Sequence, residues 1–260
     1  MLPFVQIGPA AVQVPGLVLL LGLFGGLFLA ERQAPRHGVN ANDLYSLAFT
    51  ALVAGAVGAR LVYVFRYPAA FAASPLSVIS LNPGLLDLWG GLAAALIAAV
   101  VYGQRKRMAL WSTLDALVPF LSTLIISQGL ADLAAGTAFG APTRLPWGIE
   151  LWGEHRHPTQ IYYILAGAFI LLATWPGSQL LPTGSTTGTA SQHHQPVPGS
   201  RFLVFMILAS AAYLFIEAFR GDSLLSPGGF RTIQWIAWLV LAASLWGLGR
   251  LLTATGNSAS

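Results

Sequence analysis

Seven long apolar segments constrain the fold of this chain more than any other feature of its sequence. A helix needs about 20 mostly apolar residues to cross a bilayer, and each segment reaches or approaches that length. Only 8% of the 260 residues are charged, against about 25% in ordinary soluble domains. The sequence therefore predicts an all-α, polytopic membrane protein, a single integral domain over residues 1–260 with seven transmembrane helices. The segments are residues 15–30, 44–65, 86–103, 114–135, 160–176, 201–219 and 232–252.

Two connections between the apolar segments differ in composition. Residues 136–159 are rich in Pro, Trp, His and charge, which is typical of a functional loop. Residues 176–200 contain no charged residue and many Gly, Ser, Thr and Pro, so we expect a flexible linker there. The linker holds His193 and His194 but supplies no fixed hydrogen-bonding surroundings for a metal ligand. With no cysteine in the chain, thiolate ligands and disulfides are excluded, and we expect neither a metal nor a cofactor.

The distribution of Lys and Arg indicates how the helices cross the membrane. The cluster Arg105-Lys106-Arg107 directly follows an apolar segment, which is typical of a cytoplasmic boundary next to anionic headgroups. An N-out, C-in arrangement also leaves more basic residues inside than outside. The net charge of +4 forms no basic stripe, so we expect no nucleic-acid partner.

Polar residues inside or beside the apolar segments gather at one end under this orientation. Such residues in lipid face a protein interior or a wet cavity. The sequence therefore predicts one polar cavity that opens to the outer leaflet. Its candidate residues are Arg60, Gln128, Asp132, Glu217 and Arg220, together with the loop over 150–157.

Several of these residues also have a purely structural interpretation. Arg60 can pair with a neighbouring carbonyl or carboxylate. Glu217 and Arg220 share a helix face, so they can form a local ion pair. His157 precedes Pro158, a pattern that can simply mark the start of a helix. The sequence leaves both interpretations open.

The chemistry of this cavity suits a phosphate. Guanidinium groups match phosphate geometry through paired donors, and a histidine can move a proton near neutral pH. The motifs of α/β-hydrolases, P-loop proteins and zinc proteases are absent from the sequence. A cavity of this kind can bind an anionic phospholipid headgroup and assist a nucleophile that displaces it.

Short motifs along nearly the whole chain resemble those of the prolipoprotein diacylglyceryl transferases. The most specific are residues 140–148 and the run RHPTQIY over 156–162. The segment FIEAFR over 215–220 is similar to a late family segment with an important arginine. Weaker similarities cover residues 7–17, 58–67 and 90–92.

This resemblance implies a reaction, partners and site residues. The family transfers a diacylglyceryl group from phosphatidylglycerol to a cysteine thiol in the signal peptide of a lipoprotein precursor, releasing glycerol phosphate, at the bacterial plasma membrane. Here Arg220, with Arg60 and Arg156, would hold the phosphate, and His157 would assist deprotonation of the thiol. Because a thiol has an unperturbed pKa of about 8.5, a weak base such as histidine is sufficient to deprotonate it. We expect Arg220 and His157 to be catalytic, with membrane lipid and substrate contacts from Arg60, Arg156, Gln160, Tyr162, Glu217, Gln128 and Asp132.

The chain departs from the family pattern in its fourth apolar segment. The family motif G-R-I-G-N-F-x-N-G corresponds to residues 128–136, which read QGLADLAAG. Gln128 can donate one neutral hydrogen bond in place of the missing arginine. Within this segment, Gly129 replaces that arginine, and Asp132 and Ala135 replace two asparagines. Elsewhere in the chain, Trp89 replaces a histidine, Pro15 a tyrosine and Tyr163 a glutamate of the family pattern.

These departures keep two further hypotheses open. One is a non-catalytic lipid- or lipoprotein-binding membrane protein on the same scaffold. The other is a transferase that acts on a different lipid or acceptor.

Overall fold

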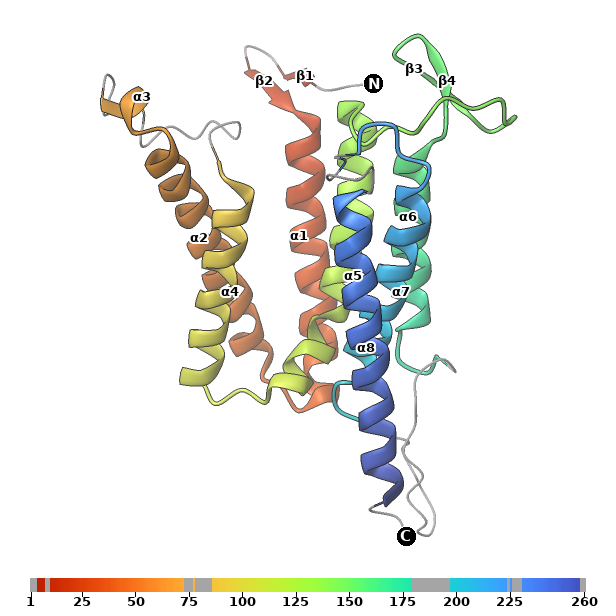
Figure 1. Ribbon diagram of the computed structural model, residues 1–260. Helices are drawn as coiled ribbons and strands as arrows, with labels where there is room; N and C mark the ends of the chain where they lie inside the picture. The colour runs from red at the N-terminus through yellow and green to blue at the C-terminus, as the bar shows by residue number, and fades with distance from the viewer. Residues whose placement is uncertain are drawn as a thin grey trace. The chain divides into compact units, whose positions relative to one another are not determined.

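The computed structural model describes residues 4–7, 10–72, 77, 86–178, 197–223, 225 and 231–257. Within these residues the protein is helical apart from two short antiparallel hairpins, β1–β2 and β3–β4 (Figure 1). The helices are α1 (Val14–Gln33), α2 (Ala41–Arg66), α3 (Pro68–Ala72), α4 (Leu88–Arg105), α5 (Leu110–Ala135), α6 (Thr159–Ala173), α7 (Ser200–Glu217) and α8 (Thr232–Asn257), with a 3-10 helix over Ala34–His37. The strands are β1 (Phe4–Ile7), β2 (Ala10–Gln13), β3 (Ile149–Leu151) and β4 (Glu154–Arg156).

Each of the seven expected apolar segments coincides with a helix. Six of these helices, α1, α2, α4, α5, α7 and α8, are long and apolar enough to cross a membrane. Helix α6 is apolar but has only 15 residues. The prediction of a helical, multi-pass membrane protein is therefore confirmed. The seventh crossing and the orientation stay predictions.

The described chain forms two compact units. The first comprises Met1–Ala30 and Leu114–Ser260, and the second comprises Glu31–Thr113. Whether they act as the single domain expected from the sequence stays a prediction. Most of the expected linker over 176–200, including His193 and His194, lies outside the described residues.

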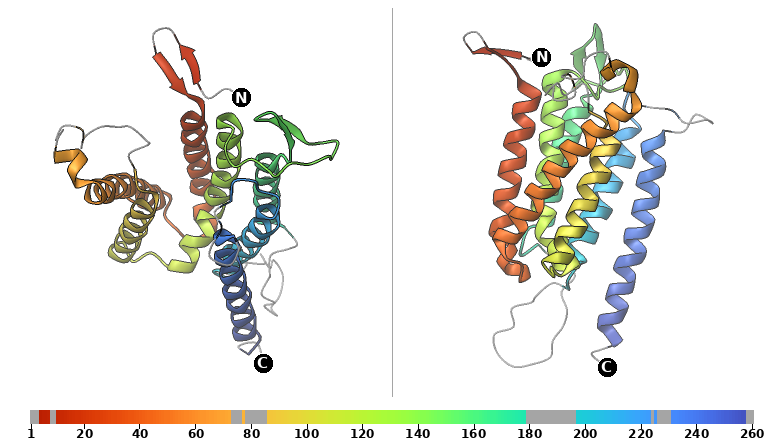
Figure 2. Two further views of the ribbon diagram at one scale, coloured as in Figure 1. Left: turned by 45° about the horizontal axis from the view of Figure 1, so that its top comes forward. Right: turned by 90° about the vertical axis from the view of Figure 1, so that its left-hand side faces the viewer.

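In the second unit, α2 and α4 pack side by side through small residues (Figure 2). A Cβ atom on Gly55 would lie 3.1 Å from the Cβ of Ala95 and 3.2 Å from the carbonyl oxygen of Gly91. Small residues allow this close approach in lipid, where packing drives helix association. Asp87 caps the start of α4 by accepting the Gly90 N–H at 2.8 Å, and it pairs with Arg66 at 2.6 Å.

In the first unit, the core lies among α5, α6 and α7. It is built on Val118, Ile170, Phe205 and Ala209, all of them buried. The connected helices α5 to α8 run in alternating directions (Figure 1), so the end of α5, the start of α6 and the end of α7 meet at one end of the unit. That end carries the β3–β4 hairpin and the polar residues.

The opposite end of the first unit is fixed by a buried carboxylate. Asp115 is 1% exposed. Its two oxygens accept the backbone N–H groups of Gly199 at 2.6 Å and Phe202 at 2.7 Å. These donors belong to the first turn of α7, where no partner exists within the helix itself. Asp115 therefore attaches the start of α7 to α5.

Candidate functional site

A polar pocket of about 270 Å³ lies within the first unit. Its walls come from the second half of α5, the loop after it, the first turns of α6, the end of α7 and the residues that follow α7. It is therefore built where the helix ends meet. The lining residues are Ile125, Gln128, Gly129, Asp132, Thr137, Ala138, Tyr163, Tyr213, Arg220 and Asp222.

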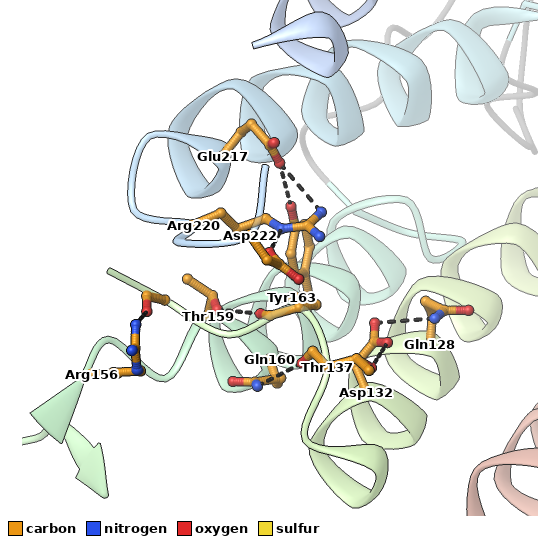
Figure 3. Close-up of polar contacts among 12 residues, drawn as sticks. Gln128, Asp132, Thr137, Arg156, Thr159, Gln160, Tyr163, Glu217, Arg220 and Asp222 are labelled. Carbon is orange, nitrogen blue, oxygen red and sulfur yellow. Dashed lines mark hydrogen bonds and ion pairs between the residues drawn. The ribbon is translucent and has the colours of Figure 1, made fainter. Parts of the chain in front are cut away.

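Arg220 supplies the positive charge of this wall. Its Nε donates to Asp222 Oδ1 at 2.9 Å, and its Nη1 lies 3.5 Å from Glu217 Oε2 (Figure 3). Burial by itself favours the neutral guanidinium, but the hydrogen bond and charge of Asp222 outweigh it, so the pKa of Arg220 is raised above its ordinary value. Arg220 therefore stays charged at any physiological pH.

Glu217 stands behind Arg220. It is fully buried, and its Oε2 accepts a hydrogen bond from the Tyr163 hydroxyl at 3.4 Å. Its Oε1 has no hydrogen-bond partner among the described residues. The local ion pair that the sequence left open is present, and it extends into a cluster of Tyr163, Glu217, Arg220 and Asp222.

A second polar cluster surrounds Asp132. Gln128 Nε2 donates to Asp132 Oδ2 at 3.0 Å, and Thr137 Oγ1 donates to Asp132 Oδ1 at 2.7 Å (Figure 3). Gln160 is fully buried and donates to the Thr137 carbonyl at 2.8 Å. These bonds fix the loop after α5 against the start of α6, with the Asp132 carboxylate at the pocket.

Backbone hydrogen bonds join three chain segments beside this pocket. Residues 139–143 lie between residues 219–221 and residues 155–157. The Ala141 N–H donates to the Phe219 carbonyl at 2.7 Å, and the Gly221 N–H donates to the Phe139 carbonyl at 2.9 Å. On the other side, the His157 N–H donates to the Ala141 carbonyl at 3.0 Å. The backbone itself therefore sets the position of Arg220.

At Gly129, the position of the missing family arginine, helices α5 and α6 pack closely. A Cβ there would lie 2.9 Å from the Gln160 carbonyl oxygen and 3.2 Å from the Ile164 backbone nitrogen. Helices α5 and α6 thus touch backbone to backbone at this position. No larger side chain fits without moving α6.

His157, the expected base, is not among the residues that line the pocket. Its Nδ1 lies 3.3 Å from the Tyr162 hydroxyl, and its ring is 5.0 Å from that of Phe219. The Tyr162 hydroxyl also accepts the Trp147 indole N–H at 3.0 Å. Tyr162 therefore has its own hydroxyl proton available for His157.

Arg156 and Arg60, the other two expected phosphate ligands, hold backbone carbonyls. Arg156 donates to the carbonyls of Leu151 at 3.2 Å and Gly140 at 3.3 Å, and it pairs with Glu154. Arg60 lies in the second unit and hydrogen-bonds the Ser77 carbonyl, the kind of pairing that its structural interpretation anticipated. A role for either in phosphate binding stays a prediction.

Four of the polar lining residues are not predicted as site residues by the sequence: Thr137, Tyr163, Tyr213 and Asp222. For Tyr163, the sequence shows only a departure from the family motif. The position of Asp222 could have indicated its role, because it follows Arg220 by two residues just beyond a helix end. Tyr213 carried none, since a tyrosine in an apolar helix is ordinary.

The fold and the pocket define a class: a multi-pass helical membrane protein with a polar pocket at its helix ends. The sequence profile described as "Prolipoprotein diacylglyceryl transferase" matches residues 3–250. The chain belongs to that family.

Individual relatives agree with this assignment. A phosphatidylglycerol–prolipoprotein diacylglyceryl transferase from Nostoc sp. is 28% identical over 253 residues, covering 95% of this chain and 88% of that protein. The protein of the same name from Chloroflexus aggregans is 28% identical over 243 residues, covering 85% of this chain and 76% of that protein. The counterpart from Trichormus variabilis is 27% identical, with 95% and 88% covered.

Proposed function

We propose that this protein is a diacylglyceryl transferase, which moves a diacylglyceryl group from phosphatidylglycerol to the cysteine thiol of a lipoprotein precursor. The family match over residues 3–250 supports the reaction class. The observation that carries the proposal is a charged Arg220 on the wall of a polar pocket, in the segment that resembles the family's arginine motif.

In the proposed reaction the thiol sulfur attacks the glycerol carbon that carries the phosphate ester. A C–S bond forms, the C–O bond to phosphate breaks, and glycerol phosphate leaves with the bonding electrons. Arg220 stabilises the charge that develops on the departing phosphate. Gln128, Asp132, Gln160 and Glu217 shape the headgroup site.

The thiol proton needs an acceptor on the substrate's path to the pocket. We propose that His157 takes it, with Tyr162 holding the imidazole through the 3.3 Å contact to Nδ1. Arg156 contributes by fixing residues 139–140 next to Arg220, and Arg60 by a lipid contact in the second unit.

We place the protein in the bacterial plasma membrane with seven crossings, N-out and C-in. The end of the first unit that holds the pocket then faces outward. A signal peptide anchored in the membrane would present its cysteine at that level.

Reconstitution tests the proposal. The protein is placed in phosphatidylglycerol vesicles with a peptide that carries a signal-peptide cysteine, and lipid-modified peptide is measured by mass spectrometry. We expect product with the natural chain. Lipid binding without any product would instead support the non-catalytic hypothesis, which the close packing at Gly129 and the paired state of Arg220 favour.

A further inference from the structure

Tyr163 lies between the pocket and a buried carboxylate. Its side chain lines the pocket together with Arg220, whereas Glu217 is not among the lining residues. The Tyr163 hydroxyl donates to Glu217 Oε2 at 3.4 Å, and Arg220 Nη1 lies 3.5 Å from the same oxygen (Figure 3). Tyr163 and Arg220 therefore share one carboxylate oxygen, so a change in one contact affects the other.

Glu217 depends on this donor because it is fully buried. A buried carboxylate is stable only with hydrogen bonds or an opposite charge beside it. Among the described residues, the Tyr163 hydroxyl is the one neutral donor to Glu217, and Oε1 has no hydrogen-bond partner there. Loss of the hydroxyl would strengthen the attraction between Glu217 and Arg220, and it would draw the guanidinium away from the pocket.

Two helix contacts fix the position of the hydroxyl. The ring of Tyr163 on α6 packs against that of Tyr213 on α7, with centroids 5.1 Å apart and planes inclined by 48°. The α6 backbone adjoins α5 at Gly129, where a Cβ would lie 2.9 Å from the Gln160 carbonyl oxygen. Tyr163 is 6% exposed, so its ring has little room to turn. A side chain locked by packing in this way can orient the group that it contacts.

We infer that Tyr163 is a positioning residue for Arg220. Its hydroxyl occupies part of the acceptor capacity of Glu217, so the carboxylate keeps Arg220 at the pocket wall instead of pairing with it closely. Asp222 holds the other edge of the guanidinium through Nε at 2.9 Å. The consequence for catalysis rests on the proposed function, in which Arg220 binds the phosphate of phosphatidylglycerol.

A double-mutant cycle in lipid binding tests this role. The full chain in detergent is titrated with phosphatidylglycerol, and bound lipid is counted by native mass spectrometry. Tyr163→Phe removes only the hydroxyl, and we expect at least about fivefold weaker binding, since hydrogen bonds to charged groups are strong. In a Glu217→Gln background no carboxylate is left to hold, so the same change should weaken binding less than about twofold. Equal losses in both backgrounds would overturn the inference.

Two further comparisons separate the hydroxyl from the ring. Tyr213→Phe makes the same change on the neighbouring ring, and its effect should not depend on Glu217→Gln. An equal dependence would contradict a specific role for Tyr163. At position 163, para-aminophenylalanine keeps a neutral donor, whereas para-methylphenylalanine has nearly the same shape and no donor. We expect tighter lipid binding with the amino group, and equal binding would overturn the inference even if Tyr163→Phe does not fold.

Lipidation assays in phosphatidylglycerol vesicles separate this inference from the proposed function. Peptide product from the natural chain, with equal losses in the binding cycle, overturns the inference and leaves the proposed function standing. A binding loss that depends on Glu217, without any product, supports the positioning role and removes the transferase. Where product forms, Tyr163→Phe should lower the lipidation rate, and this effect should shrink in the Glu217→Gln background.

Discussion

Arg220 is the residue on which the proposed chemistry depends. It combines a wall position in the pocket with two carboxylate partners at 2.9 Å and 3.5 Å. These partners hold the guanidinium in place but also compete with any phosphate for its donors. If Arg220 binds phosphate as proposed, we expect the affinity to depend on how far Asp222 moves aside.

Replacing Arg220 by Ala should reduce the rate of peptide lipidation by at least about 100-fold, the usual effect of removing one preorganised donor from a developing charge. Arg220→Lys keeps the charge but loses the forked geometry of the guanidinium. Its lipidation rate should therefore lie between the rates of the natural chain and of Arg220→Ala. The initial rate in reconstituted vesicles is the measurement. Arg250→Ala is the control, because Arg250 lies over Trp246 on α8 and outside the pocket lining. Full activity in Arg220→Ala would remove Arg220 from the site.

At the scale of elements, the loop over 139–143 determines where Arg220 lies. A Cβ atom on Gly140 would collide with the His157 carbonyl, and one on Gly221 would lie 2.9 Å from the Gly140 carbonyl oxygen. Both glycines are needed because three backbone segments approach each other there.

Gly140→Ala should therefore destabilise the protein by about 1–3 kcal/mol, as overpacking does in tight cores, and it should lower the transfer rate. Thermal unfolding in detergent and the lipidation rate are measured together. Gly16→Ala serves as the matched control, since a Cβ there meets nothing within 4 Å. Equal unfolding temperatures for the two variants would contradict this account.

The attachment of α7 to α5 belongs to the same scale. Asp115→Ala removes the acceptor of two backbone N–H groups in a buried place, and each buried unsatisfied donor costs about 1–3 kcal/mol. We expect a marked loss of thermal stability, whereas Asp43→Ala, which breaks a surface pair with Lys106, should change it little. A stable Asp115→Ala protein would show that α7 is held mainly by its apolar face.

At the scale of the whole molecule, the orientation in the membrane decides whether the pocket can meet its substrates. The chain contains no cysteine, so single cysteines report accessibility without background. Glu150→Cys lies on the β3–β4 hairpin, and Ala109→Cys lies between α4 and α5. In intact cells an impermeant maleimide should label the first and spare the second. The reverse pattern would place the pocket on the cytoplasmic side.

The sequence by itself determined the seven apolar helical segments and the family. Apolar length alone locates all seven helical segments, because a run of about 20 apolar residues has few other stable states in a membrane protein. The run over 156–162 and the segment over 215–220 were enough to indicate the family that the comparison confirms.

Only the tertiary structure decided which polar residues share the pocket. Asp132 and Arg220 are far apart in sequence, and their common wall depends on how α5, α6 and α7 pack. The sequence could not show that Arg156 donates to the carbonyls of Leu151 and Gly140. Every residue has a backbone carbonyl, so residue type does not reveal which carbonyl accepts a hydrogen bond. The sequence also did not indicate that Gly129 lies against the α6 backbone. The physical reason is the same in each case: a side chain's role is set by neighbours that folding brings to it, whereas helix formation in lipid is set by the segment's own composition.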